Sequence, residues 1–130
     1  MATKETVNKW LELVDEDLSV AQDLYKTKHW LYTAFMCHQV IEKSLKAYWV
    51  ATRDDDPPYI HDHKRLAEGC GLYEKLTNEQ RVFLTVIREM NIEARYREYK
   101  NRIAASLNEQ NTKELLQQTI EMQQWIREQF

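Results

Sequence analysis

The sequence predicts an all-α fold, a four- to five-helix up-and-down antiparallel bundle without a sheet. The chain of 130 residues contains only two Gly and two Pro, too few for a turn-rich β architecture. Charged residues make up 30% of it, and hydrophobic residues recur three and four positions apart, as in helices with one buried face. A chain of this length forms one hydrophobic core, so we expect a single domain over residues 1–130.

The first predicted helix covers residues 4–27. Its hydrophobic residues follow the i, i+3, i+4, i+7 spacing of a helix with one buried face: Val7, Trp10, Leu11, Val14, Leu18, Ala21 and Leu24. Asp17 interrupts this face. Exposure at the edge of the face is one interpretation, and a buried carboxylate with a cationic partner is the other, because burying it unpaired would be unfavourable.

The second predicted helix covers residues 29–52 and ends before the DDDPP run at residues 54–58. Its hydrophobic positions form a wide face: Trp30, Leu31, Ala34, Phe35, Cys37, Ile41, Leu45, Tyr48 and Trp49. Such width indicates neighbours on more than one side of the helix. We take Trp30, Tyr48 and Trp49 as the basis for predicting a symmetric homodimer.

Capping signals place the remaining helices. Asp62 is expected to cap a short helix through Glu68, which Gly69 or Gly71 would end. Residues 77–80 (TNEQ) fit a capping box that opens a long helix, with a core face of Phe83, Val86, Ile87, Met90 and Ala94. Residues 97–107 either continue that helix or bend away from it. A last helix over 112–129 is expected to bury Leu115, Leu116, Met122 and Ile126.

Composition restricts the function classes. The N-terminal residues lack the hydrophobic region of a signal peptide, and no hydrophobic run reaches the roughly 20 residues that span a bilayer. We therefore expect a soluble cytoplasmic protein with no membrane contact. The net charge of -3 argues against a general nucleic-acid coat protein, although residues 63–102 hold nine Lys/Arg against six Asp/Glu. Two cysteines in a cytosolic chain are expected to stay reduced.

Polar residues form a stripe on the second predicted helix: His38, Gln39, Glu42, Lys43 and Lys46. His38 and Glu42 are one turn apart, as are Glu42 and Lys46. One interpretation is a solvated strip that carries a weak ion pair. The other is a surface that recognises a phosphate, a base or a partner helix.

A second polar cluster is ARYREYKNR, residues 94–102, in which four cations alternate with Tyr96 and Tyr99. Guanidinium groups such as that of Arg95 bind phosphates through two hydrogen bonds, and tyrosine rings stack on bases. The alternative is a helix C-terminus whose cations favour the helix dipole.

No catalytic or metal-binding motif emerges. His61, Asp62 and His63, with His38, Cys37 or Cys70, lack the spacing of metal ligands, so a helix cap beside loop histidines is the preferred interpretation. We expect no metal and no cofactor. A glycine-rich phosphate loop, a G-x-S-x-G elbow and the Glu-x-x-His pairs of di-iron bundles are absent from the sequence.

Four segments, in this order, resemble the HEPN family of small helical proteins. The first is WLELVDEDLSVAQDL, and the second is HWLYTAFMCHQVIEKSLKAYWV, where the family's Q-x-x-E-K-x-L-K-A pattern matches Gln39, Glu42, Lys43, Leu45, Lys46 and Ala47. IHDHKRLAEGCGL is similar to the T-H-D-L segment through His61 and Asp62. IEARYREY is similar to the family's A-R-Y-P-D segment, with Arg97 in place of the Pro.

The resemblance implies a non-catalytic protein that binds a nucleotide or a separate minimal nucleotidyltransferase, in a toxin–antitoxin-like pair. HEPN ribonucleases carry Arg-x4–6-His, whereas here Arg88 is followed by Arg95, and arginine is a poor general base. The predicted binding patch is Gln39, Glu42, Lys43, Lys46, Arg88, Arg95 and Tyr96. The alternative for this patch is a buried ion-pair network with Asp17 as its acidic member. The alternative functions are a metal-independent ribonuclease acting on RNA and a purely structural dimer.

Overall fold

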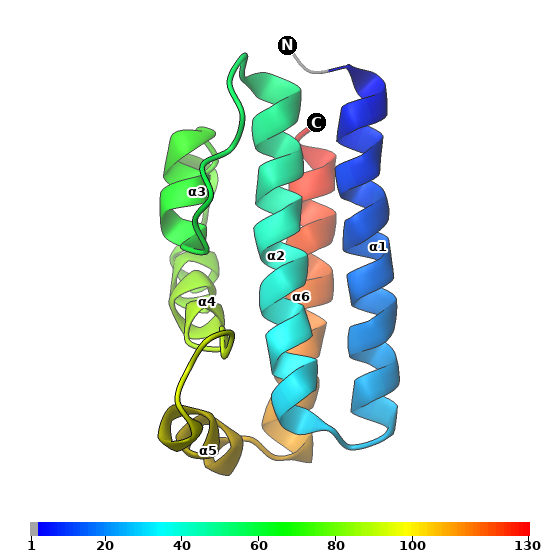
Figure 1. The fold of residues 1–130 in the computed structure, drawn as a ribbon. Coiled ribbons are helices and arrows are strands. Elements are labelled where there is room, and N and C mark those ends of the chain that lie inside the picture. Colours follow the sequence, from blue (N-terminus) through cyan, green and yellow to red (C-terminus); the bar gives the residue numbers. More distant parts are fainter. Residues whose placement is uncertain (1–2) are drawn as a thin grey trace.

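The computed structural model describes residues 3–130, which form six α-helices and one 3-10 turn, with no strand among them (Figure 1). The elements are α1 (Lys4–Lys26), α2 (Trp30–Thr52), α3 (His63–Gly69), the 3-10 turn η1 (Tyr73–Lys75), α4 (Asn78–Arg88), α5 (Arg97–Ser106) and α6 (Glu109–Glu128). The predicted all-α class is confirmed.

The four longer helices alternate in direction along the chain and form the predicted antiparallel bundle (Figure 1). Helices α1, α2 and α6 lie side by side, while α3 and α4 cover the side of α2 that faces away from α1. Helix α5 crosses one end of the bundle. Because α2 contacts all five other helices, the polar groups on it lie beside several elements at once.

The wide hydrophobic face of α2 is explained by this central position. Tyr48 and Trp49 are buried against the chain's own core, and Trp30 is half-buried beside the ring of Tyr25. The face that motivated the homodimer is therefore largely used within one chain. The homodimer itself stays a prediction.

The region after α4 differs from the expected long helix. Helix α4 ends at Arg88, and residues 89–96 form a connection in which Ala94 has a φ of 58°. That left-handed conformation is unfavourable for alanine inside a helix and reverses the chain there. Val86 and Ala94, both expected in the core, are exposed, whereas Ile92 is buried. The helical spacing of hydrophobic residues continues in the sequence past Arg88, although the helix itself ends there.

Helix α5 begins immediately after Tyr96, so Arg97 occupies its first position. This is where proline is favoured in helices, since the first N–H groups of a helix lack internal partners. The HEPN pattern A-R-Y-P therefore fits the same turn, with Arg97 starting the helix in place of the proline. The chain does not continue as a helix from α4 through Tyr96.

Capping explains most helix starts. The Thr77 side chain and Gln80 form the predicted capping box of α4, which is confirmed. Helix α6 begins at Glu109, earlier than the predicted residue 112, because Asn108 and Asn111 form a second capping box. The helix thereby gains a turn whose Thr112 is fully buried. Within the described residues, no helix is long and apolar enough to cross a membrane.

Candidate functional site

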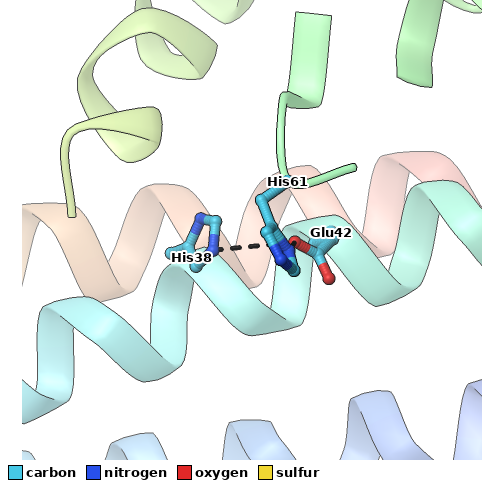
Figure 2. A group of neighbouring side chains, drawn as sticks. All are labelled: His38, Glu42 and His61. Carbon is cyan, nitrogen blue, oxygen red and sulfur yellow. Dashed lines mark hydrogen bonds and ion pairs between the residues drawn. The ribbon is translucent and has the colours of Figure 1, made fainter. Parts of the chain in front are cut away.

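The middle of α2 carries a buried polar cluster that the segment before α3 completes. Figure 2 shows the side chains of His38 and Glu42, from α2, and His61 turned toward one another. Glu42 Oε1 lies 2.6 Å from His61 Nδ1 and 3.7 Å from His38 Nε2. The ligand-type atoms of all three residues lie within 4.8 Å of one another, so among the described residues this group is spaced closely enough to hold a metal ion.

Burial differs across this cluster. The side chains of His38 and Glu42 are 1% and 7% exposed, whereas that of His61 is 35% exposed and forms the rim of the cluster. The second carboxylate oxygen of Glu42 faces Lys46, whose Nζ lies 3.3 Å away. Glu42 thus joins α2 to the loop before α3 and pairs with a cation on its own helix.

Two buried histidines stack edge-to-face behind the cluster, with the ring centroids of His38 and His63 4.6 Å apart. Burial, together with the smaller electrostatic effects of the nearby His63, His61 and Lys46, lowers the pKa of His38 to about 2. Burial also lowers the pKa of His63 to about 4. His63 Nε2 donates a hydrogen bond of 3.0 Å to the His38 carbonyl oxygen. Both imidazoles are therefore neutral near pH 7 and keep a nitrogen lone pair.

The polar stripe of α2 divides between two neighbours. Lys43 turns toward α1, where its Nζ lies 2.5 Å from Asp17 Oδ2 in a pair that is mostly buried. Asp17 is thus a buried carboxylate with a cationic partner rather than an exposed residue at the edge of the α1 face. Gln39 is half-buried, and its Oε1 has no hydrogen-bond partner among the described residues.

Beside the buried cluster lies a small polar cavity of about 210 Å³. Five residues line it: His61, Asp62, Arg88, Asn91 and Arg95. Asp62 also caps α3 by accepting hydrogen bonds from the backbone N–H groups of Lys64 and Arg65. Arg88 is 64% exposed, and its Nη2 lies 3.6 Å from Asp62 Oδ2, a loose ion pair that leaves most guanidinium donors available.

Arg95 stands exposed at the cavity and is oriented by an aromatic ring. Its guanidinium lies 4.8 Å from the centroid of Tyr99, and that of Arg102 lies 5.0 Å from the same ring. Tyr99 is fixed by donating a 2.6 Å hydrogen bond to the Glu89 carbonyl oxygen. Tyr96 is 85% exposed. Arg97 begins α5, and the last turn of that helix holds no basic residue, so the interpretation as a C-terminal cationic decoration is wrong.

A family model of the HEPN domain matches residues 7–129. The chain belongs to the HEPN family. A search of curated proteins gave no match, and neither did a search of solved structures. The HEPN match begins in the first turn of α1 and extends past the end of α6, so it includes the other five α-helices and every connection.

Within this HEPN fold, segments far apart in the chain meet at one place. Glu42 of the Q-x-x-E-K pattern contacts His61 of the H-D segment, and Arg95 of the A-R-Y segment lines the same cavity as His61. Lys43 lies apart, paired with α1. Arg95 is exposed instead of pairing with Asp17 or Glu42, which was the alternative for a structural network.

Four members of this HEPN site were not among the predicted patch residues: His38, His61, Asp62 and Asn91. Of these, Asp62 was predicted as a helix cap and His61 as a loop histidine beside it. His38 was considered as part of the polar stripe and as a metal ligand beside His61 but was left out of the patch, although its i, i+4 spacing from Glu42 was the available signal. Nothing in the sequence identified Asn91 as a site residue, because polar residues are common in the connections between helices. Its place in the cavity depends on the turn after α4.

Proposed function

We propose that this HEPN protein binds a nucleotide through its phosphate groups at the cavity between Arg88 and Arg95, without catalysing a reaction. The observation that carries the proposal is the convergence of two guanidinium groups on one polar cavity. Both arginines are exposed, and neither is committed to a buried carboxylate. A pair of this kind fits a di- or triphosphate, because each guanidinium presents several donors in a fixed plane.

The surroundings of the two arginines suit such a ligand. Arg95 is held over Tyr99, so less side-chain freedom is lost when it binds an anion. Asn91 adds an amide that can donate to a phosphate or to a ribose oxygen. Tyr96, next to Arg95 and almost fully exposed, offers a ring for a base; stacking of this kind contributes about 1–3 kcal/mol per base.

The same surface is suited to binding the expected protein partner. The HEPN resemblance implies a minimal nucleotidyltransferase encoded separately, in a toxin–antitoxin-like pair. An exposed aromatic residue beside two arginines, as at Tyr96, is typical of the side chains that dominate protein interfaces. Tagged HEPN protein is expected to co-purify with a nucleotidyltransferase encoded beside it, and Tyr96→Ala is expected to reduce the recovered partner.

Calorimetry with ATP in the presence of EDTA tests nucleotide binding. We expect saturable binding that Arg95→Ala weakens by about 10- to 150-fold, corresponding to about 1.5–3 kcal/mol for charged hydrogen bonds. Arg102→Ala is the matched control, because Arg102 stacks on the same Tyr99 ring but does not line the cavity. Absence of both ATP binding and partner recovery would remove the proposal.

One observation favours a second candidate, a metal-independent ribonuclease. His61 lies beside Arg88 and Arg95 although no Arg-x4–6-His motif is present, and its Nδ1 is oriented by Glu42 as in a general base. The discriminating assay is cleavage of single-stranded RNA in EDTA. Cleavage that is lost in both His61→Ala and Arg95→Ala would favour the ribonuclease, whereas intact RNA favours the binding protein.

A further inference from the structure

The ring of His38 is the least satisfied polar group in the bundle core. Both of its nitrogens are buried without a hydrogen-bond partner among the described residues. Glu42 Oε1 is the carboxylate oxygen nearest to Nε2, but the separation of 3.7 Å is too long for a hydrogen bond. The great majority of buried polar groups in proteins have a hydrogen-bond partner, so an imidazole left without one points to a ligand.

The atoms around His38 form a ligand set for a metal ion. Tetrahedral zinc binds nitrogen and carboxylate oxygen at about 2.0–2.2 Å, which places neighbouring ligand atoms roughly 3.3 Å apart. Here the two measured separations from Glu42 Oε1 are 2.6 Å to His61 and 3.7 Å to His38, on either side of that value. The ligand atoms of His38 and His61 lie within 4.8 Å of each other, so coordination of one ion requires the two imidazoles to turn toward it.

The chemistry of the three groups agrees with this geometry. The imidazole of His38 is kept neutral by burial, and the neutral ring is the form that donates a lone pair to a metal. His61 Nδ1 carries the proton of its bond to Glu42, and transfer of that proton to Nε2 gives the tautomer that coordinates through Nδ1. His61 is 35% exposed, which gives an ion access from solvent.

We propose that His38, Glu42 and His61 bind a divalent transition-metal ion of the zinc class. Two imidazoles and one carboxylate select such an ion over Mg²⁺ or Ca²⁺, which prefer oxygen ligands. Lys46, paired with the other Glu42 oxygen, acts as an outer partner whose positive charge opposes the ion. The positive charge of Lys46 therefore lowers the affinity of the site for the metal ion.

Titration of EDTA-treated, dialysed protein with Co²⁺ alone tests the site through the visible d–d absorption of the ion. We expect one equivalent to bind, and His61→Ala to weaken binding by more than about 100-fold, since removing even an outer partner of a metal ligand weakens binding 10- to 100-fold. Glu42→Gln, which preserves side-chain volume, is expected to act in the same direction. Lys46→Met is expected to tighten binding, an effect that a merely structural lysine would not produce.

His29→Ala is the matched control, because His29 is exposed at the start of α2 and lies outside the cluster. It is expected to change Co²⁺ affinity by less than about twofold. Circular dichroism verifies that each variant is folded, and Zn²⁺ is expected to raise the unfolding temperature of the unmodified protein but not of His61→Ala. The inference is overturned if Co²⁺ does not saturate the unmodified protein, if His61→Ala binds like His29→Ala, or if thiolate charge-transfer bands assign the ion to a cysteine. No nucleotide is present, so this outcome is independent of nucleotide binding.

Discussion

Asp17 illustrates how one residue joins two helices. A carboxylate on the hydrophobic face of α1 is stabilised because Lys43 reaches it from α2, with a 2.5 Å separation between the charged atoms. Both side chains are mostly buried, so water compensates only weakly for the loss of either partner. The pair therefore connects α1 to α2 through a hydrogen bond between charged groups.

Replacing either member of this pair is expected to destabilise the fold. Asp17→Ala or Lys43→Ala should reduce the free energy of unfolding by about 1.5–3 kcal/mol, the range for a hydrogen bond between charged groups. Urea denaturation measures this loss, with the exposed Glu16→Ala as the control. In the double variant the losses should be less than additive. Equal stability of Asp17→Ala and Glu16→Ala would contradict the pairing.

Arg95 is expected to behave in the opposite way, because its side chain is exposed and stacks only on Tyr99. Arg95→Ala should change the free energy of unfolding by no more than about 0.5 kcal/mol, as for ordinary surface substitutions. Urea denaturation checks this. A loss of about 3 kcal/mol or more would instead indicate a buried ion pair, the alternative that the sequence left open for this arginine.

Helix α3 is held against α2 by close contact between Gly69 and the Trp49 ring. A Cβ placed on Gly69 would lie 2.2 Å from a carbon of that ring, which is itself stacked under Arg53. Gly69→Ala is therefore expected to lower the free energy of unfolding by about 1–3 kcal/mol through overpacking. Glu68→Ala, an exposed change on the same helix, is the control. A stable Gly69→Ala would show that Trp49 moves freely at this contact.

The junction between α2 and α3 also predicts a dependence on pH. The pKa values of His38 and His63 are lowered in the fold, mainly by burial, to about 2 and about 4. The unfolded chain binds protons at these histidines below about pH 6.5, whereas the folded chain does not, so stability falls as pH decreases through that range. Glu42, His61 and Lys46 face the same cluster. The carboxylate of Glu42 raises the pKa of His63 and so offsets part of the effect of burial.

We expect the free energy of unfolding, measured by urea denaturation in EDTA, to fall by about 2 kcal/mol between pH 7 and pH 5.5. Each histidine contributes up to about 1.4 kcal/mol per pH unit. Ordinary carboxylates remain ionised in this window, so they do not produce the slope. His63→Gln keeps a donor for the His38 carbonyl oxygen and should reduce the slope. Stability independent of pH over this range would mean that the histidines are charged in the fold.

At the scale of the whole molecule, local patterns predicted most of the fold. The hydrophobic spacing located α1 and α2, and the Thr77 capping box located the start of α4. The long helix through Ala94 was wrong because periodicity continued past a turn that needs a positive φ at a non-glycine residue. Nothing in the local sequence marks such a turn.

The candidate site could be predicted only in part. Glu42 and Lys46 share one helix, so their spacing was visible in the sequence. The contact between Glu42 and His61 spans 19 positions, and it depends on how the loop after α2 folds back along that helix. Likewise, the sequence does not show which cation pairs with Asp17. The partner is Lys43, because α1 packs on α2.

The homodimer remains a prediction at this scale. The wide face of α2 no longer supports it, but Val82 and Val86 are exposed one turn apart on α4. Light scattering at micromolar concentration is expected to give twice the chain mass of 15.7 kDa. A mass of one chain would contradict it, and Val82→Glu should dissociate a dimer that uses this surface.

An amide NMR titration of ¹⁵N-labelled protein with ATP in EDTA tests the nucleotide-binding site most directly, because it reports where the ligand lies. The predicted result is saturable shift changes confined to the residues around His61, Arg88, Asn91 and Arg95, and their loss in Arg95→Ala. Shift changes on another face of the bundle, or none at millimolar ATP, would contradict the assignment of this cavity as the nucleotide site.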